Sequence, residues 1–314
     1  MEKTYKTAIL IPCYNEEKTI EKVISDFRRV MPEADIYIYD NNSTDKSVEI
    51  IQSMVSDKVH LCFEHKQGKG NVVRRMFREI EADCYIMVDA DDTYPAESAP
   101  TLEAAVKDNL CDMAIGDRLS GTYYTENKRP FHNLGNNLVR DMVNHFFKAD
   151  MHDIMTGLRA MSKDFVKTYA ILCEGFEIET DMTIFALDNG YIIKEYPIEY
   201  RDRPEGSVSK LNTYSDGAKV IITIARLLRD VKPLRFFSII GFLFLIISSI
   251  LFIPVFNEYL ATGMVRRFPT LIVSSATIIA SMMSFFAGMV LQVLRRYHKE
   301  NIERHRICLS SQKH

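Results

Sequence analysis

The 314-residue chain has no tryptophan, and none of its six cysteines is spaced as a CxxC pair. Scattered cysteines without such pairs predict reduced thiols in a cytosolic compartment, and argue against a zinc site or a disulfide framework. The net charge is only −3, which argues against a general nucleic-acid-binding protein. The apolar stretch near the amino terminus is too short for a signal peptide, so none is expected.

Two long stretches lack charged residues altogether. Residues 236–256 carry no charge over 21 positions, and residues 269–294 carry none over 26 positions. A helix of 21 residues rises roughly 30 Å, the thickness of the bilayer hydrocarbon. A pair of buried core helices is the alternative, but soluble core helices seldom run this long without charge. We therefore predict a transmembrane hairpin within residues 235–314, with spans at about 236–256 and 269–294.

Basic residues flank the two spans on one side. They are Arg226, Arg229, Lys232 and Arg235 before the first span, and Arg295, Arg296, His298 and Lys299 after the second. The connecting loop holds only Arg266 and Arg267, partly offset by Glu258. The positive-inside rule therefore predicts that both termini, the carboxy-terminal tail and the domain at residues 1–212 are cytosolic. Residues 213–234 are expected to form an amphipathic juxtamembrane helix, with a core helix as the alternative.

Strand and helix patterns alternate through the cytosolic domain, which predicts an α/β fold with a mostly parallel sheet covered by helices on both faces. Four predicted strands end in polar clusters, at residues 12–16, 40–45, 68–71 and 89–92. Ligands bind beyond the carboxyl ends of strands in such sheets. The clusters therefore indicate a small-molecule enzyme. A loop, KQGKGN, is expected before the helix that begins VVRRMF.

The stretch YIMVDADDTYPAE places Asp89, Asp91 and Asp92 directly after a buried strand. Carboxylates this close raise one another's pKa, so a cation is expected among them: a metal ion, a basic side chain, or otherwise plain solvent. Mg²⁺ and Mn²⁺ prefer carboxylate oxygens. On a regular strand Asp89 and Asp91 would point to opposite faces, whereas a turn beginning at Asp89 would bring both to one ligand. Taken alone, the DxD pattern is more often a solvated turn.

The surrounding motifs resemble the inverting family 2 glycosyltransferases, which have the Rossmann-like GT-A fold. Within that family the chain looks like the polyprenyl-phosphate glycosyltransferases, the group of dolichyl-phosphate mannose synthase and its bacterial membrane-hairpin relatives. The matching pieces are ILIPCYNEE (9–17), DNNSTD (40–45), QGKGNVVR (67–74), VDADDTYPAE (88–97), GDR (116–118), DIMTGLRAM (153–161) and EYRDRPEGSVSKL (199–211). They occur in family order over residues 5–230.

The resemblance implies a donor site and a metal site. The residues it places around the nucleotide donor are Pro12, Tyr14, Glu16, Asp40, Asn42, Lys69 and Gly70. Asp89 and Asp91 would hold Mg²⁺ or Mn²⁺ on the donor pyrophosphate. Thr93 stands where relatives often have glutamine, and DNNSTD replaces an Asp-Asp-Gly-Ser pattern, so the third metal ligand and base recognition depart from the family.

The resemblance also implies that the nucleophile is a lipid phosphate, which is already ionised at neutral pH and has less need of a general base. Cations must instead hold two phosphorylated substrates together. Arg118, Arg129 and Asn133 are expected to bind the acceptor phosphate. Four later residues would close over the pyrophosphate: Arg201, Arg203, Ser209 and Lys210. Arginine suits this role because its planar fork binds two oxygens.

The sequence leaves the roles of two further pairs of residues open. Asp153 and Arg159 either pair with each other or position the site. Glu177 and Glu179 either orient the sugar or cap local structure.

The predicted function is transfer of a sugar from UDP-glucose or a UDP-N-acetylhexosamine to undecaprenyl phosphate at the bacterial cytoplasmic membrane. A GDP-mannose-dependent transferase and a non-catalytic, membrane-anchored nucleotide-sugar sensor are the alternatives. A processive transferase is disfavoured because its QxxRW motif requires tryptophan. The resemblance further implies a homo-oligomer, a tetramer. A single two-helix hairpin is too small to flip the lipid-linked product by itself, so a separate flippase is expected.

Overall fold

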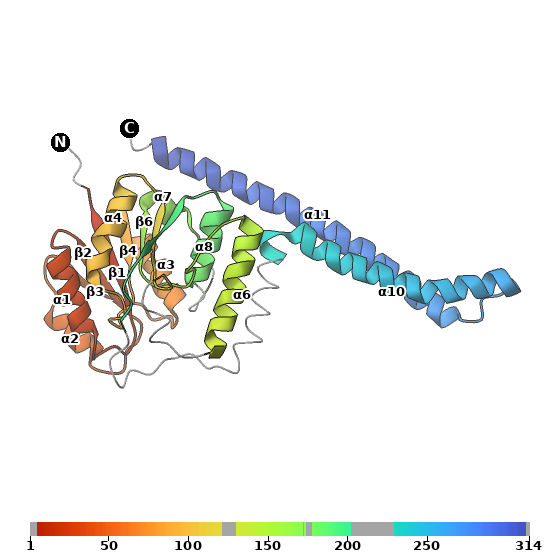
Figure 1. Cartoon of the computed structure of the whole chain (residues 1–314), viewed down its shortest axis with the longest axis horizontal. Helices are drawn as coiled ribbons and strands as arrows, with labels where there is room; N and C mark the ends of the chain where they lie inside the picture. Colours follow the sequence, from red (N-terminus) through yellow and green to blue (C-terminus); the bar gives the residue numbers. More distant parts are fainter. Residues whose placement is uncertain (1–4, 121–129, 172, 174–177, 202–228, 312–314) are drawn as a thin grey trace. The chain divides into compact units, whose positions relative to one another are not determined.

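The computed structural model describes residues 5–120, 130–171, 173, 178–201 and 229–311, with the backbone alone at 130–136, 138 and 310. The chain divides into two compact units. One comprises Met1–Thr213 with Cys308–His314, and the other comprises Tyr214–Ile307. Figure 1 shows the elements of both units.

The first unit is built on a seven-stranded sheet within the described residues. Its strands are β1 (Thr7–Cys13), β2 (Asp35–Asp40), β3 (Val59–Phe63), β4 (Cys84–Met87), β5 (Met113–Asp117), β6 (Arg159–Ser162) and β7 (Ile193–Pro197). The spatial order is β3-β2-β1-β4-β6-β5-β7. Only β6 runs antiparallel to its neighbours β4 and β5, while the other pairs are parallel. The prediction of a mostly parallel α/β sheet is confirmed.

Helices pack on this sheet through apolar stripes, as α1 illustrates. Ile20, Val23, Ile24 and Phe27 recur at helical spacing and are all buried in the core. Among the described residues of this unit, the helices are α1 (Ile20–Val30), α2 (Ser47–Ser53), α3 (Lys69–Glu79), η1 (Ala96–Ser98), α4 (Ala99–Lys107), α6 (Pro130–Phe147), α7 (Lys163–Thr168) and α8 (Ile178–Asp188).

Helix α3 begins earlier in the chain than the sequence pattern predicts, at Lys69 rather than at Val72. Gly68 precedes it with φ 124°, a backbone conformation that favours glycine. The carbonyl of Gly68 accepts hydrogen bonds from the backbone N–H groups of Asn71 and Val72. Lys69 and Gly70 therefore lie in the first helical turn, where the backbone is fixed, and not in a loop.

The strand register brings the polar clusters to one edge of the sheet. Cys13 at the end of β1 lies opposite Asp40 at the end of β2, and Leu10 lies opposite Met87 at the end of β4. Since these strands are parallel, the segments that follow them emerge on the same side. The clusters at residues 12–16, 40–45 and 89–92 consequently share this edge.

The second unit contains two long apolar helices, α10 (Pro233–Thr262) and α11 (Phe268–Ser311), the latter as far as Ile307. Their mean hydropathies reach 2.8 and 1.9, and both are long enough to cross a membrane. The Ser281 hydroxyl donates to the carbonyl of Gly241 at 2.7 Å, and the Ser248 hydroxyl donates to that of Ser274 at 2.8 Å. Helix α11 continues to Ser311, so the residues after the predicted second span are helical, too.

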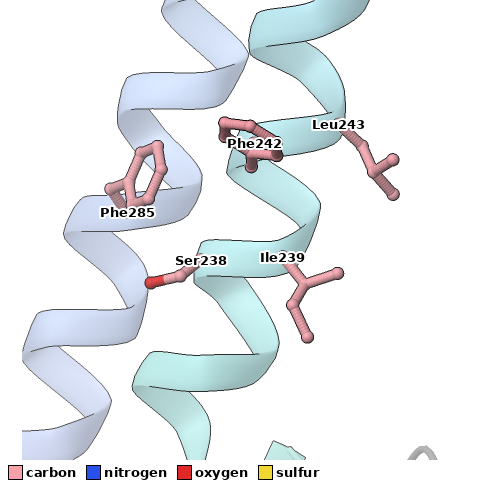
Figure 2. Close-up of a pocket in the computed structure, with 5 residues that line it drawn as sticks. All are labelled: Ser238, Ile239, Phe242, Leu243 and Phe285. Atoms are coloured by element: carbon pink, nitrogen blue, oxygen red, sulfur yellow. The ribbon is translucent and has the colours of Figure 1, made fainter.

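A shallow apolar groove runs along this helix pair (Figure 2). It is lined by Ser238, Ile239, Phe242, Leu243 and Phe285. Figure 2 shows Ser238 on the α11 side of α10, and Ile239 and Leu243 on the opposite side. The side chains of Ile239, Phe242 and Leu243 are exposed. Large exposed apolar side chains of this kind match a lipid environment.

Candidate active site

The carboxylates of the DADD segment leave the sheet together, because β4 ends at Met87. Residues 90 and 91 form a turn, and Asp92 adopts the left-handed backbone with φ 57°. Asp89 and Asp91 are thus not on a regular strand, and the alternation that would separate them does not apply. The structure provides the turn that the sequence pattern required for a shared ligand.

Asp91 is held by the residue two positions later. Its side chain is buried, and its Oδ1 accepts a hydrogen bond from the Thr93 hydroxyl at 2.6 Å and one from the Thr93 N–H at 3.3 Å. Thr93 itself is buried. The departure from glutamine at this position therefore places an orienting hydroxyl beside the carboxylate.

Substituting Thr93 by valine is expected to lower the catalytic efficiency about tenfold. Valine has a similar shape to threonine but lacks the hydroxyl that donates to the buried Asp91 carboxylate. The measurement is steady-state kcat/KM for sugar transfer at several Mn²⁺ concentrations. Thr93→Ser, which keeps the hydroxyl, should stay near the unmodified enzyme. Equal losses in both variants would contradict the orienting role.

The cation beside Asp89 is a basic side chain, Lys69. Its ammonium pairs with Asp89 Oδ1 and also with Glu179 Oε1, the latter at 2.5 Å. The side chains of Lys69 and Glu179 are only 9 % and 7 % exposed. Burial alone would lower the pKa of Lys69, but the charges of Asp89 and Glu179 outweigh it and raise the pKa above its ordinary value. Lys69 is therefore a charged ammonium between two carboxylates.

Gly157 lets the loop before β6 approach Asp89 closely. A Cβ at this position would lie 2.7 Å from Asp89 Cγ, closer than real side chains come. The Gly157 N–H donates to the hydroxyl of the buried Tyr94 at 2.7 Å. Within the motif DIMTGLRAM, the lack of a side chain at this glycine thus lets the Asp89 carboxylate occupy the space beside it.

The loops beside the expected donor residues are joined through Asn41, a residue that the sequence pattern did not single out. Its side-chain amide donates to the carbonyls of Glu64 and Lys66, at 2.8 and 2.7 Å. Its carbonyl oxygen accepts from the Gly68 N–H at 2.7 Å. Asn41 therefore connects the end of β2 to the start of α3. An Asn-Asn pair carried no signal that separated it from an ordinary turn.

Asp40 is buried at the end of β2, and its two oxygens differ. Oδ2 accepts a hydrogen bond from the Ser43 N–H at 3.0 Å, whereas Oδ1 is buried without a hydrogen-bond partner. A buried acceptor without a partner is costly, and a ligand donor would satisfy it. The adjacent Asn42 donates to the His65 carbonyl at 2.9 Å, so its side chain holds the loop.

The remaining expected donor residues lie at the same edge. Pro12, Tyr14 and Glu16 are half-buried at the end of β1, and Gly70 is buried in the first turn of α3. The Glu16 N–H donates to the Ser47 hydroxyl at 2.8 Å, which ties this segment to α2. The structure thus brings together every described residue of the expected donor set.

On the expected acceptor side, Arg118 is engaged with an acidic residue. Its guanidinium makes two hydrogen bonds to Asp153, Nε to Oδ2 at 2.7 Å and Nη2 to Oδ1 at 3.0 Å. Asp153 is 2 % exposed, and Arg118 lies 5.5 Å above the ring of Tyr200. The partner of Asp153 is therefore Arg118 rather than Arg159.

Arg159 is fully buried and has its own partners. Its guanidinium donates to the carbonyls of Ile154 and Thr156, at 2.7 and 3.0 Å, and to the hydroxyl of Thr183 at 2.8 Å. Burial lowers the pKa of Arg159. This side chain joins the loop before β6 to helix α8, which carries Glu179.

Arg201 lies beside the DADD turn. Its N–H donates to the Thr93 carbonyl at 3.0 Å, and its guanidinium approaches Asp92 at 3.6 Å and Glu97 at 3.4 Å. Arg129, Arg203, Ser209, Lys210 and Glu177 lie outside the described residues, as does most of the expected juxtamembrane helix. Asn133 belongs to α6, where only its backbone is described.

A divalent cation at this site would find two carboxylates and few other protein ligands. The described part of the chain holds no cluster of three or more His, Cys, Asp or Glu side chains able to bind a metal. Mg²⁺ and Mn²⁺ are commonly held by one or two carboxylates, with waters and substrate phosphates completing the shell. The donor set of Asp89 and Asp91 fits such an ion.

Residues 8–170 match the model of the family described as glycosyl transferase family 2. Glycosyltransferase AglJ of Haloferax volcanii is 27% identical over 297 residues, covering 94% of this chain and 96% of the relative. A dolichyl-phosphate hexose transferase of the same organism is 27% identical over 213 residues, covering 68% of this chain and 90% of the relative.

The fold has a counterpart among solved structures. Glucosyl-3-phosphoglycerate synthase from Mycobacterium tuberculosis, in complex with Mn²⁺, uridine diphosphate and phosphoglyceric acid, superposes with a TM-score of 0.55. It is 18% identical, and the match covers 71% of this chain and 78% of that one. At this identity the likeness establishes a shared fold, which is GT-A.

Proposed function

The chain belongs to glycosyl transferase family 2, and on that premise we propose that it moves a sugar from a nucleotide-sugar to a polyprenyl phosphate. The main observation that supports this proposal is that one chain holds both the Asp89–Asp91 turn at the sheet edge and two helices of membrane-spanning length. The carboxylate turn suits a charged, metal-bound donor. The apolar helices suit an acceptor that stays in the bilayer.

In the proposed reaction, an oxygen of the lipid phosphate attacks the anomeric carbon as the bond to the donor pyrophosphate breaks. A nucleoside diphosphate leaves, and the anomeric configuration inverts. The phosphate nucleophile is already ionised, so positioning and charge stabilisation dominate over proton transfer. A divalent cation, when bound by Asp89 and Asp91, supplies neutralisation of the charge that develops on the leaving diphosphate.

The protein residues divide between donor and acceptor in this proposal. Asp40, with its unpartnered Oδ1, would accept a hydrogen bond from the base or ribose. The other donor residues are Pro12, Tyr14, Glu16, Asn42, Lys69 and Gly70, with Arg201, Arg203, Ser209 and Lys210 closing over the pyrophosphate. The acceptor phosphate is assigned to Arg118, Arg129 and Asn133. Arg118 is paired with Asp153, so this assignment requires that the paired guanidinium can still face the acceptor phosphate.

The proposed donor is UDP-glucose or a UDP-N-acetylhexosamine, with GDP-mannose as the second candidate, and the acceptor is undecaprenyl phosphate. The proposed setting is the bacterial cytoplasmic membrane, with the catalytic domain and both termini in the cytosol. The basic flanks of the two apolar stretches support this orientation. A homo-tetramer and a separate flippase for the product complete the proposal.

The test is transfer of radiolabelled sugar from a panel of UDP- and GDP-sugars to undecaprenyl phosphate, with Mg²⁺ or Mn²⁺ and with EDTA. We expect an organic-soluble product from one donor, and its loss in EDTA because the cation is removed. Nucleotide-sugar binding without a lipid product from any donor would overturn the proposal and favour the non-catalytic sensor.

A further inference from the structure

The ion-pair cluster of the buried Lys69 and Glu179 with the half-buried Asp89 suggests how the metal site is controlled. We propose that Lys69 stays paired with the Asp89 carboxylate until a divalent cation displaces it, and that Lys69 then remains paired with Glu179 alone. This inference rests on the proposed assignment of Asp89 to the cation. Lys69 and Glu179 act as positioning residues, and no contact of either with the sugar is assumed.

The geometry favours movement of the lysine over movement of Asp89. The Asp89 carboxylate packs against Gly157, which closes off one side of it. Lys69 lies in the first turn of α3, so its backbone is fixed while its long side chain ends between two acceptors. An exchange at Asp89 therefore needs only a shift of the ammonium toward Glu179.

The charges explain why a second carboxylate is needed. A buried ammonium without a counter-ion is strongly unfavourable. When the cation takes the place of the ammonium at Asp89, Glu179 keeps Lys69 paired, and the buried charge is never left alone. Glu179 is at least as buried as Lys69, so this replacement pair remains shielded from water.

The consequence is that the free enzyme should bind a bare cation weakly. One of the two proposed metal carboxylates is already neutralised by Lys69, and the described residues form no group of three or more His, Cys, Asp or Glu side chains able to hold a metal. The phosphates of the donor must then supply the remaining ligands. Metal and nucleoside diphosphate are accordingly expected to bind together.

The test titrates Mn²⁺ into the full chain in detergent and follows the free ion by electron paramagnetic resonance, with and without UDP. Lys69→Met should bind Mn²⁺ in the absence of UDP about tenfold more tightly, because the competing charge at ion-pair distance is gone. The matched control is Lys22→Met, which removes the same charge from Asp92 in the same turn. It should change the affinity less than about twofold, as expected for an exposed pair.

Glu179→Gln should act in the opposite direction and weaken Mn²⁺ binding, since Lys69 would lose the partner that releases it from Asp89. A general loosening of the site would weaken binding in both variants. Unchanged or weaker Mn²⁺ binding by folded Lys69→Met overturns the proposal. If that variant does not fold, unchanged binding by Glu179→Gln overturns it instead. Neither readout needs sugar transfer, so a failed lipid acceptor assay would leave this result standing.

Discussion

Replacing Asp91 by asparagine is expected to lower kcat/KM for sugar transfer by about 100- to 1,000-fold, the range seen when a preorganised charge-stabilising group is removed. The substitution keeps the shape of a buried side chain that accepts hydrogen bonds from Thr93, so the fold should persist. What is lost is the negative charge proposed to hold the cation. The measurement is initial-rate transfer to the lipid acceptor at saturating Mn²⁺.

Asp92→Asn is the matched control for this substitution. Asp92 belongs to the same turn, but it pairs with Lys22 at 2.7 Å and lies near Arg201. Its backbone φ of 57° is one that asparagine adopts readily. We expect a change of less than about threefold, because exposed ion pairs contribute little. Similar losses in both variants would show that the turn responds to charge in general, and would refute the specific role of Asp91.

Replacing Arg118 by methionine is expected to reduce the free energy of unfolding by about 3–5 kcal/mol, the usual cost of leaving a buried charge unpaired. The remaining partner, Asp153, is 2 % exposed and would lose two hydrogen bonds. The measurement is thermal unfolding of the purified chain in detergent. Lys58→Met, which removes a more exposed pair with Asp35, should cost only about 0–1 kcal/mol.

The same variant separates two roles for Arg118. If the guanidinium serves chiefly to pair with Asp153, the loss is in stability. If it chiefly binds the acceptor phosphate, Arg118→Met should remain as stable as the unmodified protein and show a raised KM for the lipid. A stable, fully active variant would contradict both roles.

Family membership and the general fold were accessible from the sequence because their signals are local. The alternation of strand and helix patterns and the buried stripe of α1 follow from the spacing of apolar residues. The two apolar stretches are recognisable from composition alone. The order of motifs along the chain identified the family, and residues 8–170 match its model.

The start of α3 shows where local reasoning erred. The QGKGN stretch reads as a loop because glycine is frequent in loops. Gly68 alone needs the unusual backbone, with φ 124°, and the helix begins immediately after it. This difference matters to function because it fixes the backbone of Lys69 in the site.

What the sequence by itself determined is the alternation of the first four strands with their helices, the candidate carboxylates and the apolar helices, since each depends on neighbours within a few residues. Only the tertiary structure decided which charges meet. Lys69 and Glu179 are 110 positions apart, and Arg118 and Asp153 are 35 apart. Ion pairs are selected by proximity and burial after the sheet has assembled, and no spacing rule along the chain encodes them.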